Sequence, residues 1–302
     1  MMLPKTSLRC LSLRQKDNLF LVLMLLPCVI VLSVIVVVPF FKLVETSLSS
    51  WKLSSALPKT FCGWKNYLEM IHDKFFWSSL KVTLYFVGTA LSIEFFLGLL
   101  VAWMLYELLK KNQVLTTLFL FPMVIPPIVV ALMWKLMYSP SLGIINYFLH
   151  FVRLDYPFLG DPKTALLAMV AIDVWEWTPF VMLLLSAGFA TIPQELEEAS
   201  AIDGASRWQI FAHISLPLLK PLIVIVLLLR MIEVVKVFPP IYILTEGGPG
   251  VHTQTLNYLI YRQCFNYTNV GYASALGVVF FFIVAVIALL VFGLIRKEGL
   301  FK

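Results

Sequence analysis

The side chains that could do chemistry lie inside long apolar segments. Four of them recur at positions i, i+3, i+4 and i+7 of one segment: Asp173, Glu176, Trp177 and Phe180. A helix would bring these two carboxylates and two aromatic rings to one face. Carboxylates accept hydrogen bonds from hydroxyl groups, and aromatic rings offer flat apolar surface to the C–H faces of a sugar. The face therefore predicts a binding site for a sugar-like solute, with structural ion pairing as the alternative.

A second set of charged residues follows in a later apolar segment. Arg230, Glu233 and Lys236 are spaced by threes and would share a helical face. Charged groups at membrane depth are costly, and they commonly line a solute path or pair with one another. Arg230 could thus meet an anionic group such as a phosphate or sulfonate, or it could be neutralised by Glu233. We expect structural or interfacial roles for Glu94 and Lys135, which lie in two other apolar segments.

Motifs of the common catalytic and nucleotide-binding classes are absent from the sequence. It has no G-x-x-x-x-G-K-[ST] loop, which excludes ATP binding of that kind. It also lacks a G-x-S-x-G elbow, an H-E-x-x-H pair and a G-x-G-x-x-G turn. The four histidines are scattered, and no Cys/His set has the spacing of a zinc site. We therefore expect no enzyme activity, no metal and no cofactor bound by this chain itself.

The composition is typical of a membrane protein. Of the 302 residues, 60% are hydrophobic and 13% are charged, whereas a soluble domain is about half apolar and about a quarter charged. The net charge of +6 fits the basic bias of membrane proteins. No cluster of Arg and Lys with interleaved aromatic residues indicates nucleic-acid binding. The sequence thus predicts an all-α polytopic protein in contact with membrane lipid and not with nucleic acid.

Six apolar segments are long enough to be membrane helices: about residues 19–41, 82–109, 115–138, 165–190, 218–244 and 273–295. The first follows a basic segment, 1–18, and is too long for a signal-peptide core, so we expect it to be retained. The chain then divides into an N-terminal segment, 1–18, and a transmembrane domain, 19–302.

Six spans place both termini on one side of the membrane. Lys and Arg are nearly balanced between the two sides, but the basic N-terminal segment favours a cytoplasmic location for the termini. Cys62 and Cys264 would share the outer face, where they could form a disulfide or remain free thiols.

A polar, acidic stretch at residues 191–221 interrupts the apolar segments. Pro193 suits the first turn of a helix, and the acidic residues after it lie at the positive end of the helix dipole. Gly204 suits a turn, and an amphipathic segment at 207–214 leads into the next apolar span. This pattern predicts two short helices around a glycine turn, forming a knob that docks on a partner. An ordinary amphipathic loop is the alternative.

The same stretch resembles the cytoplasmic EAA loop of ABC-importer permeases. The matching residues are Glu198, Ala199, Ser200, Asp203, Gly204, Ala205, Ile214, Leu216 and Pro217, with Ser200 standing where the family has a second alanine. Nearly the whole chain is similar to the carbohydrate-type permeases of that family, in the subfamily that includes the maltose and glycerol-phosphate permeases. Further matching motifs are GWKNY at 63–67, the prolines within 122–127, DVWEWTPF at 173–180 and LTEGGP at 244–249.

The resemblance implies a type I ABC importer permease fold with six transmembrane helices and cytoplasmic EAA coupling helices. It implies residence in the cytoplasmic (inner) membrane of a bacterium or archaeon, with both termini in the cytoplasm. The implied partners are a second, homologous permease subunit in a heterodimer, two cytoplasmic ATPase subunits that bind ATP and Mg, and an extracytoplasmic sugar-binding protein. The implied activity is ATP-driven uptake of a sugar or sugar derivative by alternating access.

The resemblance also assigns roles to individual residues. ATPase coupling falls on Glu198, Ala199, Asp203, Gly204, Ala205, Leu216 and Pro217. Substrate contacts fall on Asp173, Glu176, Trp177, Phe180, Arg230, Val234, Val237 and Met123, and Glu233 is added from the face of Arg230. Most of these residue types differ from those of the maltose permease, so a different ligand is expected.

Other classes of transporter remain open. A secondary transporter would also place carboxylates at mid-membrane, but it needs no EAA loop and often has repeated halves, which this sequence does not show. A membrane-embedded enzyme would need a nucleophile or metal set at membrane depth. A permease for another polar solute, such as an amino acid or a peptide, is the nearer alternative, against which the L-T-x-G-G-P turn favours carbohydrate.

Overall fold

The computed structural model describes residues 13–55, 58–151 and 156–297. Its α-helices are α1 (Leu13–Leu32), α2 (Val38–Ser47), α3 (Lys65–His72), α4 (Lys74–Lys111), α5 (Gln113–Val124), α6 (Pro127–Met137), α7 (Ile144–Phe151), α8 (Ala165–Phe189), α9 (Gln194–Ile202), α10 (Arg207–Ile210), α11 (Leu216–Val234), α12 (Pro239–Leu244), α13 (Leu256–Tyr261) and α14 (Val270–Lys297). Three π-helical segments, Ser33–Val37, Phe211–Ser215 and Arg262–Asn266, join pairs of these helices. Two short strands, β1 (Ser49–Ser50) and β2 (Thr60–Phe61), form an antiparallel hairpin.

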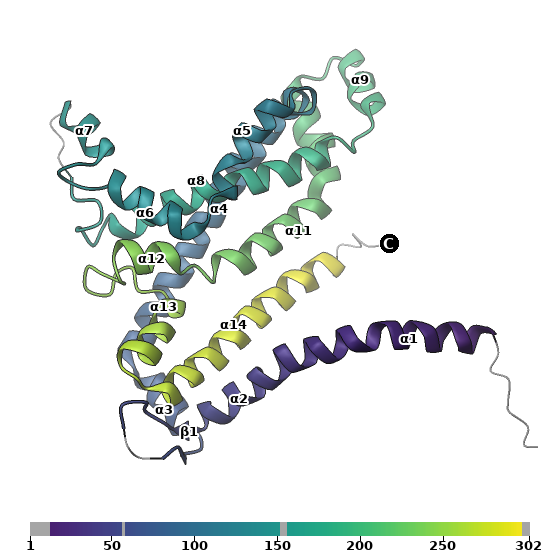
Figure 1. The fold of residues 1–302 in the computed structure, drawn as a ribbon. Helices are drawn as coiled ribbons and strands as arrows, with labels where there is room; N and C mark the ends of the chain where they lie inside the picture. The colour runs from purple at the N-terminus through teal and green to yellow at the C-terminus, as the bar shows by residue number, and fades with distance from the viewer. Residues whose placement is uncertain (1–12, 56–57, 152–155, 298–302) are drawn as a thin grey trace, which may run out of the picture.

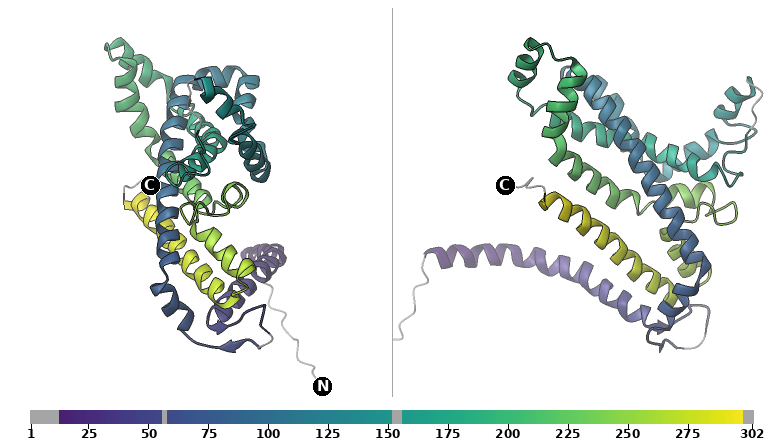
Figure 2. Two further views of the ribbon diagram at one scale, coloured as in Figure 1. Left: turned by 90° about the vertical axis from the view of Figure 1, so that its left-hand side faces the viewer. Right: turned by 180° about the vertical axis from the view of Figure 1, so that it is seen from behind.

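Helices α4, α8 and α11 form the centre of the molecule (Figure 1). α4 packs along α8, and α11 contacts both of them. α14 runs beside α11 and meets α2 near the hairpin, while α1 leads away from the other helices (Figure 2). The side chains of α1 from Phe20 onward are exposed, which leaves a long apolar surface for contact with lipid.

Four helices in the described part of the chain are long and apolar enough to cross a membrane: Phe20–Ser47, Lys74–Leu109, Ala165–Phe189 and Val270–Leu290. The pair α5 and α6 makes a fifth if the two count as one bent span. α11 is apolar as well, but it carries Lys220, Arg230 and Glu233 within 19 residues. Four of the six predicted spans therefore appear as single helices, and residues 1–12 of the predicted N-terminal segment lie outside the described residues.

The prediction of one continuous helix at 115–138 is wrong. α5 and α6 meet at a bend of 88°. Ile125 and Pro126 have ψ angles of 132° and 134°, because a residue that precedes a proline is driven out of the helical region. Pro127 then begins α6, where its missing N–H costs no hydrogen bond.

The predicted span at 218–244 is not one helix but is interrupted at residues 235–238. α11 ends at Val234, and α12 begins as a separate short helix at Pro239. The intervening residues turn, and the side-chain amide of Asn257 donates to the Lys236 carbonyl there at 2.7 Å. The break matters for the candidate site, because Arg230 and Val237 do not lie on one helix.

The motif at 63–67 organises the hairpin at one end of the molecule. The buried Asn66 side-chain amide donates to the carbonyl oxygens of Ser47 at 2.7 Å and Ser49 at 3.0 Å. The Ser47 and Tyr67 hydroxyls are hydrogen-bonded to each other at 2.7 Å. These bonds hold the end of α2 and strand β1 against α3 and satisfy backbone groups that leave the helix.

The two cysteines that could share a face are not paired. Cys62 and Cys264 are both free thiols in the structure. Burial raises the pKa of the Cys264 thiol, because the thiolate would lose contact with water. Of the two expectations for this pair, the structure therefore has the free thiols and not the disulfide.

Replacing Gly98 by alanine is expected to destabilise the fold. α4 and α8 approach so closely that a Cβ on Gly98 would lie 2.7 Å from Val181 Cγ1 and 2.8 Å from its Cβ. Val181 is β-branched and stiff, so relief requires the helices to separate, at about 1–3 kcal/mol. Gly88 on the same helix is the matched control, because its Cβ would meet nothing within 4 Å. Thermal unfolding in detergent should show a lower midpoint for Gly98→Ala alone; equal midpoints would contradict the close packing.

Candidate functional site

A buried ionic cluster joins the three central helices. Glu94 comes from α4, Asp173 from α8 and Arg230 from α11. The guanidinium of Arg230 donates from Nε to Glu94 Oε2 at 2.5 Å and from Nη2 to Glu94 Oε1 at 2.9 Å. Nη2 also donates to Asp173 Oδ2 at 2.5 Å. Arg230 thus forms a bidentate pair with one carboxylate and a second ion pair with the other.

The cluster is almost completely buried. The side chains of Arg230, Glu94 and Asp173 are 2%, 0% and 7% exposed. The ring of Trp177 lies over the guanidinium, with its centroid 4.8 Å from Arg230 Cζ, in cation–π contact. Arginine suits this position because its planar fork binds carboxylates in two places while its face stacks on an aromatic ring.

Glu176 lies one turn along α8 from Asp173 on the same face. It is buried, and its Oε1 atom has no hydrogen-bond partner among the described residues. A buried carboxylate oxygen without a donor is costly, because it has lost water and gained nothing in return. Glu176 is therefore an acceptor that a solute with hydroxyl groups can satisfy.

The structure brings only part of the predicted substrate set together. Asp173, Trp177 and Arg230 are in contact, and Glu176 lies beside them. Phe180 continues the face of Trp177, with ring centroids 6.3 Å apart.

The other predicted members lie elsewhere. Val234 and Val237 belong to the buried apolar core. Met123 lies in the last turn of α5, beside the 88° bend. The alternative that Arg230 pairs with Glu233 is wrong: Glu233 is exposed and accepts from Lys236 Nζ at 3.0 Å.

Glu94 was not among the residues predicted for the site. We expected a structural or interfacial role, whereas Glu94 provides the bidentate partner of Arg230. The signal in the sequence was a carboxylate in the middle of an apolar span, which cannot be left unpaired and so required a cation on another helix. Lys135 fits its expected structural role, because its Nζ donates to the Ile243 carbonyl at 2.7 Å and links α6 to α12.

The stretch at 191–221 folds as predicted, into two short helices around a glycine turn. α9 starts after Pro193, and its first turn holds Glu195 and Glu197. Gly204 has a φ of +83°, in the left-handed region that favours glycine. Ser206 then caps α10: its Oγ accepts from the Gln209 N–H at 3.3 Å, while Gln209 Oε1 accepts from the Ser206 N–H at 2.8 Å.

We call residues 193–210 the knob. It projects from the rest of the molecule beyond the ends of α4 and α8 (Figure 1). The predicted coupling residues Glu198, Ala199, Asp203 and Gly204 are exposed on it, and Ala205 is half-buried. Leu216 and Pro217 lie further along the chain, at the start of α11.

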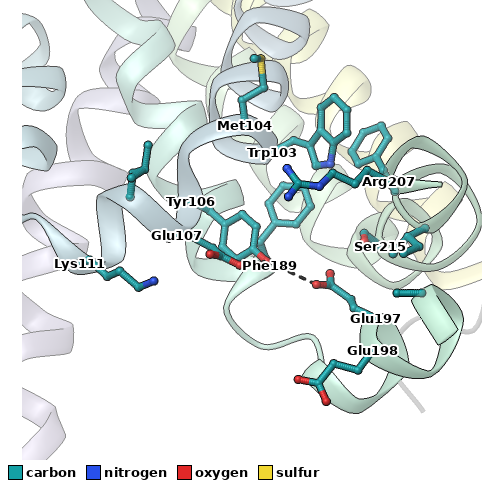
Figure 3. A pocket seen from close by; sticks show the side chains of 14 residues that line it. Trp103, Met104, Tyr106, Glu107, Lys111, Phe189, Glu197, Glu198, Arg207 and Ser215 are labelled. Atoms are coloured by element: carbon teal, nitrogen blue, oxygen red, sulfur yellow. Dashed lines mark hydrogen bonds between the residues drawn. The ribbon is translucent and has the colours of Figure 1, made fainter. Parts of the chain in front are cut away.

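A cavity of about 610 Å³ separates the knob from the end of α4. In Figure 3, Tyr106 and Glu107 on α4 face Glu197 and Glu198 on α9 across it. Tyr106 donates to Glu197 Oε2 at 3.5 Å, which is at the limit of a hydrogen bond. The cavity is lined by charges of both signs, because Lys111 and Arg207 lie among its carboxylates.

Aromatic packing joins the knob to α4 more firmly than this hydrogen bond does. The Trp103 ring lies 5.7 Å from that of Trp208, in edge contact, and 4.6 Å from that of Phe211. Such aromatic pairs contribute about 0.5–1.5 kcal/mol beyond their buried area. A movement of the knob is therefore transmitted to α4 as well as to α11.

Comparison with known proteins identifies this arrangement. A family model described as "Binding-protein-dependent transport system inner membrane component" matches residues 94–297. The chain is 40% identical over 263 residues to the trehalose/maltose transport system permease protein MalF of Thermococcus litoralis, covering 87% of this chain and 88% of that protein. It is 34% identical over 268 residues to the sulfoquinovosyl glycerol transport system permease protein SmoG of Agrobacterium fabrum, covering 88% and 86%.

Among solved structures, the chain is similar to a bacterial ABC transporter involved in the import of the acidic polysaccharide alginate. The TM-score is 0.81 at 25% sequence identity, over 93% of this chain and 96% of that one. The match spans both the ionic cluster and the knob, and the resemblance to ABC-importer permeases is confirmed. The chain belongs to the family of inner membrane components of binding-protein-dependent transport systems.

Proposed function

We propose that this protein is a permease subunit of an ATP-driven importer that takes up a sugar or sugar derivative. Its proposed partners are a second, homologous permease subunit, two cytoplasmic ATPase subunits that bind ATP and Mg, and an extracytoplasmic sugar-binding protein. The names of its relatives support the substrate class, since they include permeases for trehalose/maltose and for sulfoquinovosyl glycerol. A similar bacterial alginate ABC transporter has been solved in complex with an alginate pentasaccharide-bound periplasmic protein, which supports the binding-protein partner.

The proposed topology has six spans in the cytoplasmic (inner) membrane of a bacterium or archaeon. They are α1 with α2, α4, α5 with α6, α8, α11 and α14. The knob then lies in the cytoplasm together with both termini. The hairpin β1–β2 and helix α3 lie on the outer face, where the binding protein docks.

The main support for the proposal is that a single chain combines an exposed knob with a buried polar cluster between its central helices. The knob offers a partner two short helices and the exposed carboxylate of Glu198. The sequence has no phosphate-binding loop, so energy from ATP has to enter through a contact of this kind. The cluster supplies the polar groups and the aromatic ring that a saccharide needs.

The proposal is tested by uptake into proteoliposomes that hold the permease pair, with and without the ATPase subunits. We expect uptake of a saccharide only with ATPase, ATP and binding protein present. Uptake that continues without the ATPase would favour a secondary transporter instead.

Within the complete transporter, Trp177→Ala should lower saccharide uptake about tenfold, equivalent to about 1.4 kcal/mol of lost stacking, while the amount of assembled complex stays unchanged. Trp77→Ala is a control, because Trp77 lies near the start of α4, far along that helix from Glu94. Its indole donates to the Ile71 carbonyl there. Wild-type uptake by Trp177→Ala would show that this ring is not part of the substrate path.

A further inference from the structure

The charge of the solute is the property that similarity leaves open. The relatives include a permease for trehalose/maltose, which are uncharged sugars, and a transporter for the acidic polysaccharide alginate. A permease for an anionic saccharide needs a cation that is free to meet the anion. Arg230 is the buried cation among the predicted substrate residues, so its partners decide the matter.

Arg230 is already engaged. Its Nε and Nη2 atoms direct their hydrogens to Glu94 and Asp173, and the ring of Trp177 lies against its face. An arriving carboxylate, phosphate or sulfonate could bind the bidentate edge of the guanidinium, Nε with Nη2, only by displacing Glu94. The displaced carboxylate would then be buried without a partner, which is far costlier than the loss of a surface ion pair.

The groups around Arg230 also neutralise its charge. Two carboxyl groups face one guanidinium within the cluster, so the cluster offers no net positive charge to an anion whether one or both carboxyls are ionised. Glu176 adds a third carboxyl group on the face of Asp173, and its Oε1 atom lacks a donor. An anion would lose its water there without gaining a free opposite charge, which is costly in a setting of low dielectric constant.

The same groups suit an uncharged polyol. A hydroxyl group donates a hydrogen bond, which is what Glu176 Oε1 lacks. Trp177 and Phe180 supply rings on the same face for the apolar side of a pyranose.

We propose that this permease is selective for uncharged saccharides and that Glu94 sets this selectivity by keeping Arg230 occupied. The inference rests on the proposed sugar permease function. Glu94 is fully buried and acts through Arg230, so it is a positioning residue and not a contact to the solute.

The experiment uses the complete transporter with its own partners, in two assays. Uptake into proteoliposomes compares neutral glucose disaccharides with a glucuronic acid disaccharide of the same size. Thermal unfolding of the purified permease pair with the same compounds removes the influence of the binding protein. The wild type should take up, and be stabilised by, a neutral disaccharide but not the uronate.

Glu94→Gln keeps the shape of the side chain and removes the charge that holds Arg230. We expect the ratio of uronate to neutral uptake to rise about tenfold or more, the effect of one charge-assisted hydrogen bond, with a new stabilisation by the uronate. Glu94→Asp retains a carboxylate and should restore the wild-type ratio. Glu69→Gln, which removes an exposed carboxylate of α3, should leave the thermal response of the permease pair to both compounds unchanged, since that assay contains no binding protein.

If Glu94→Gln does not assemble, Asp173→Asn serves instead, since it removes the other carboxylate that occupies Nη2 of Arg230 and should also raise the ratio. If the wild-type transporter takes up the uronate as fast as the neutral sugar, the inference is overturned while the proposed sugar permease function stands. An unchanged ratio in the assembled charge-removing variant would also overturn it. Failure to take up any saccharide would overturn the proposed function, and the inference would fall with it.

Discussion

Gly204→Val is expected to abolish saccharide-stimulated ATP hydrolysis and uptake in the complete transporter. The φ angle of +83° places residue 204 where a β-branched side chain is strained by about 1–2 kcal/mol. A Cβ there would meet nothing within 4 Å, so the effect arises from the backbone and not from a clash. The turn relieves the strain by unwinding, which changes the angle between α9 and α10. Coupled ATPase activity and uptake, measured at equal amounts of assembled complex, test the expectation.

Gly204→Asn is the matched control for this substitution. Asparagine tolerates the left-handed region better than other residues with a Cβ, so the turn should keep its shape and most of its coupling. Equal loss in both variants would point to a steric requirement of the partner at this position. Wild-type coupling by Gly204→Val would contradict the proposal that the knob couples ATP hydrolysis to transport.

Arg230→Met is expected to reduce the folded yield and to abolish transport. The change leaves Glu94 and Asp173 buried without their common cation, at a cost of about 3–5 kcal/mol. Lys42→Met breaks an exposed ion pair with Glu45, whose side chain is 53% exposed, and should change stability by about 1 kcal/mol or less. Fluorescence-detected thermal unfolding in detergent compares the two variants.

A triple variant separates the stability of the cluster from its role in transport. Arg230→Met combined with Glu94→Gln and Asp173→Asn removes all three charges, so no unpaired ion remains. The thermal midpoint should recover much of the loss, because a buried ion pair adds little over a neutral replacement. Transport should stay low, because the polar surface for the solute has changed. Full recovery of uptake would mean that the cluster serves the fold alone.

The knob was predictable from sequence because its determinants are local. A proline before the helix, acidic residues in its first turn and a glycine after its end each act within a few residues. The structure has α9 starting after Pro193 and Gly204 in the left-handed region. The capping box of Ser206 and Gln209 is likewise a contact over three positions.

The break in the span at 115–138 was harder to predict from the sequence, although the sequence shows its prolines. Prolines are tolerated in membrane helices, so apolar length alone predicted one helix over residues 115–138. The bend of 88° follows from two consecutive X-Pro steps, Ile125-Pro126 and Pro126-Pro127, each of which forces an extended residue. A single proline would have left the helix kinked rather than divided.

The partners of Arg230 could not be read from spacing. Helical periodicity suggested Glu233, three residues away, whereas Glu94 is 136 positions distant along the chain. Which helices pack together depends on close approaches such as that of Gly98 to Val181, and those are properties of the folded chain. Sequence thus located the polar face of α8 but not the residue that completes the cluster.

The π-helical segment at Phe211–Ser215 has a mechanical consequence. It joins α10 to α11 without a break, so residues 207–234 form one helical lever. From Arg207 to Arg230 this lever is roughly 35 Å long, and a tilt of about 10° about its middle moves Arg230 by about 3 Å. That displacement is comparable to the length of a hydrogen bond, so Arg230 keeps its contact with Glu94 only if α4 moves with it. The packing of Trp103 on Trp208 and Phe211 supplies this link, so a tilt that starts at the knob would carry α4 and α11 together.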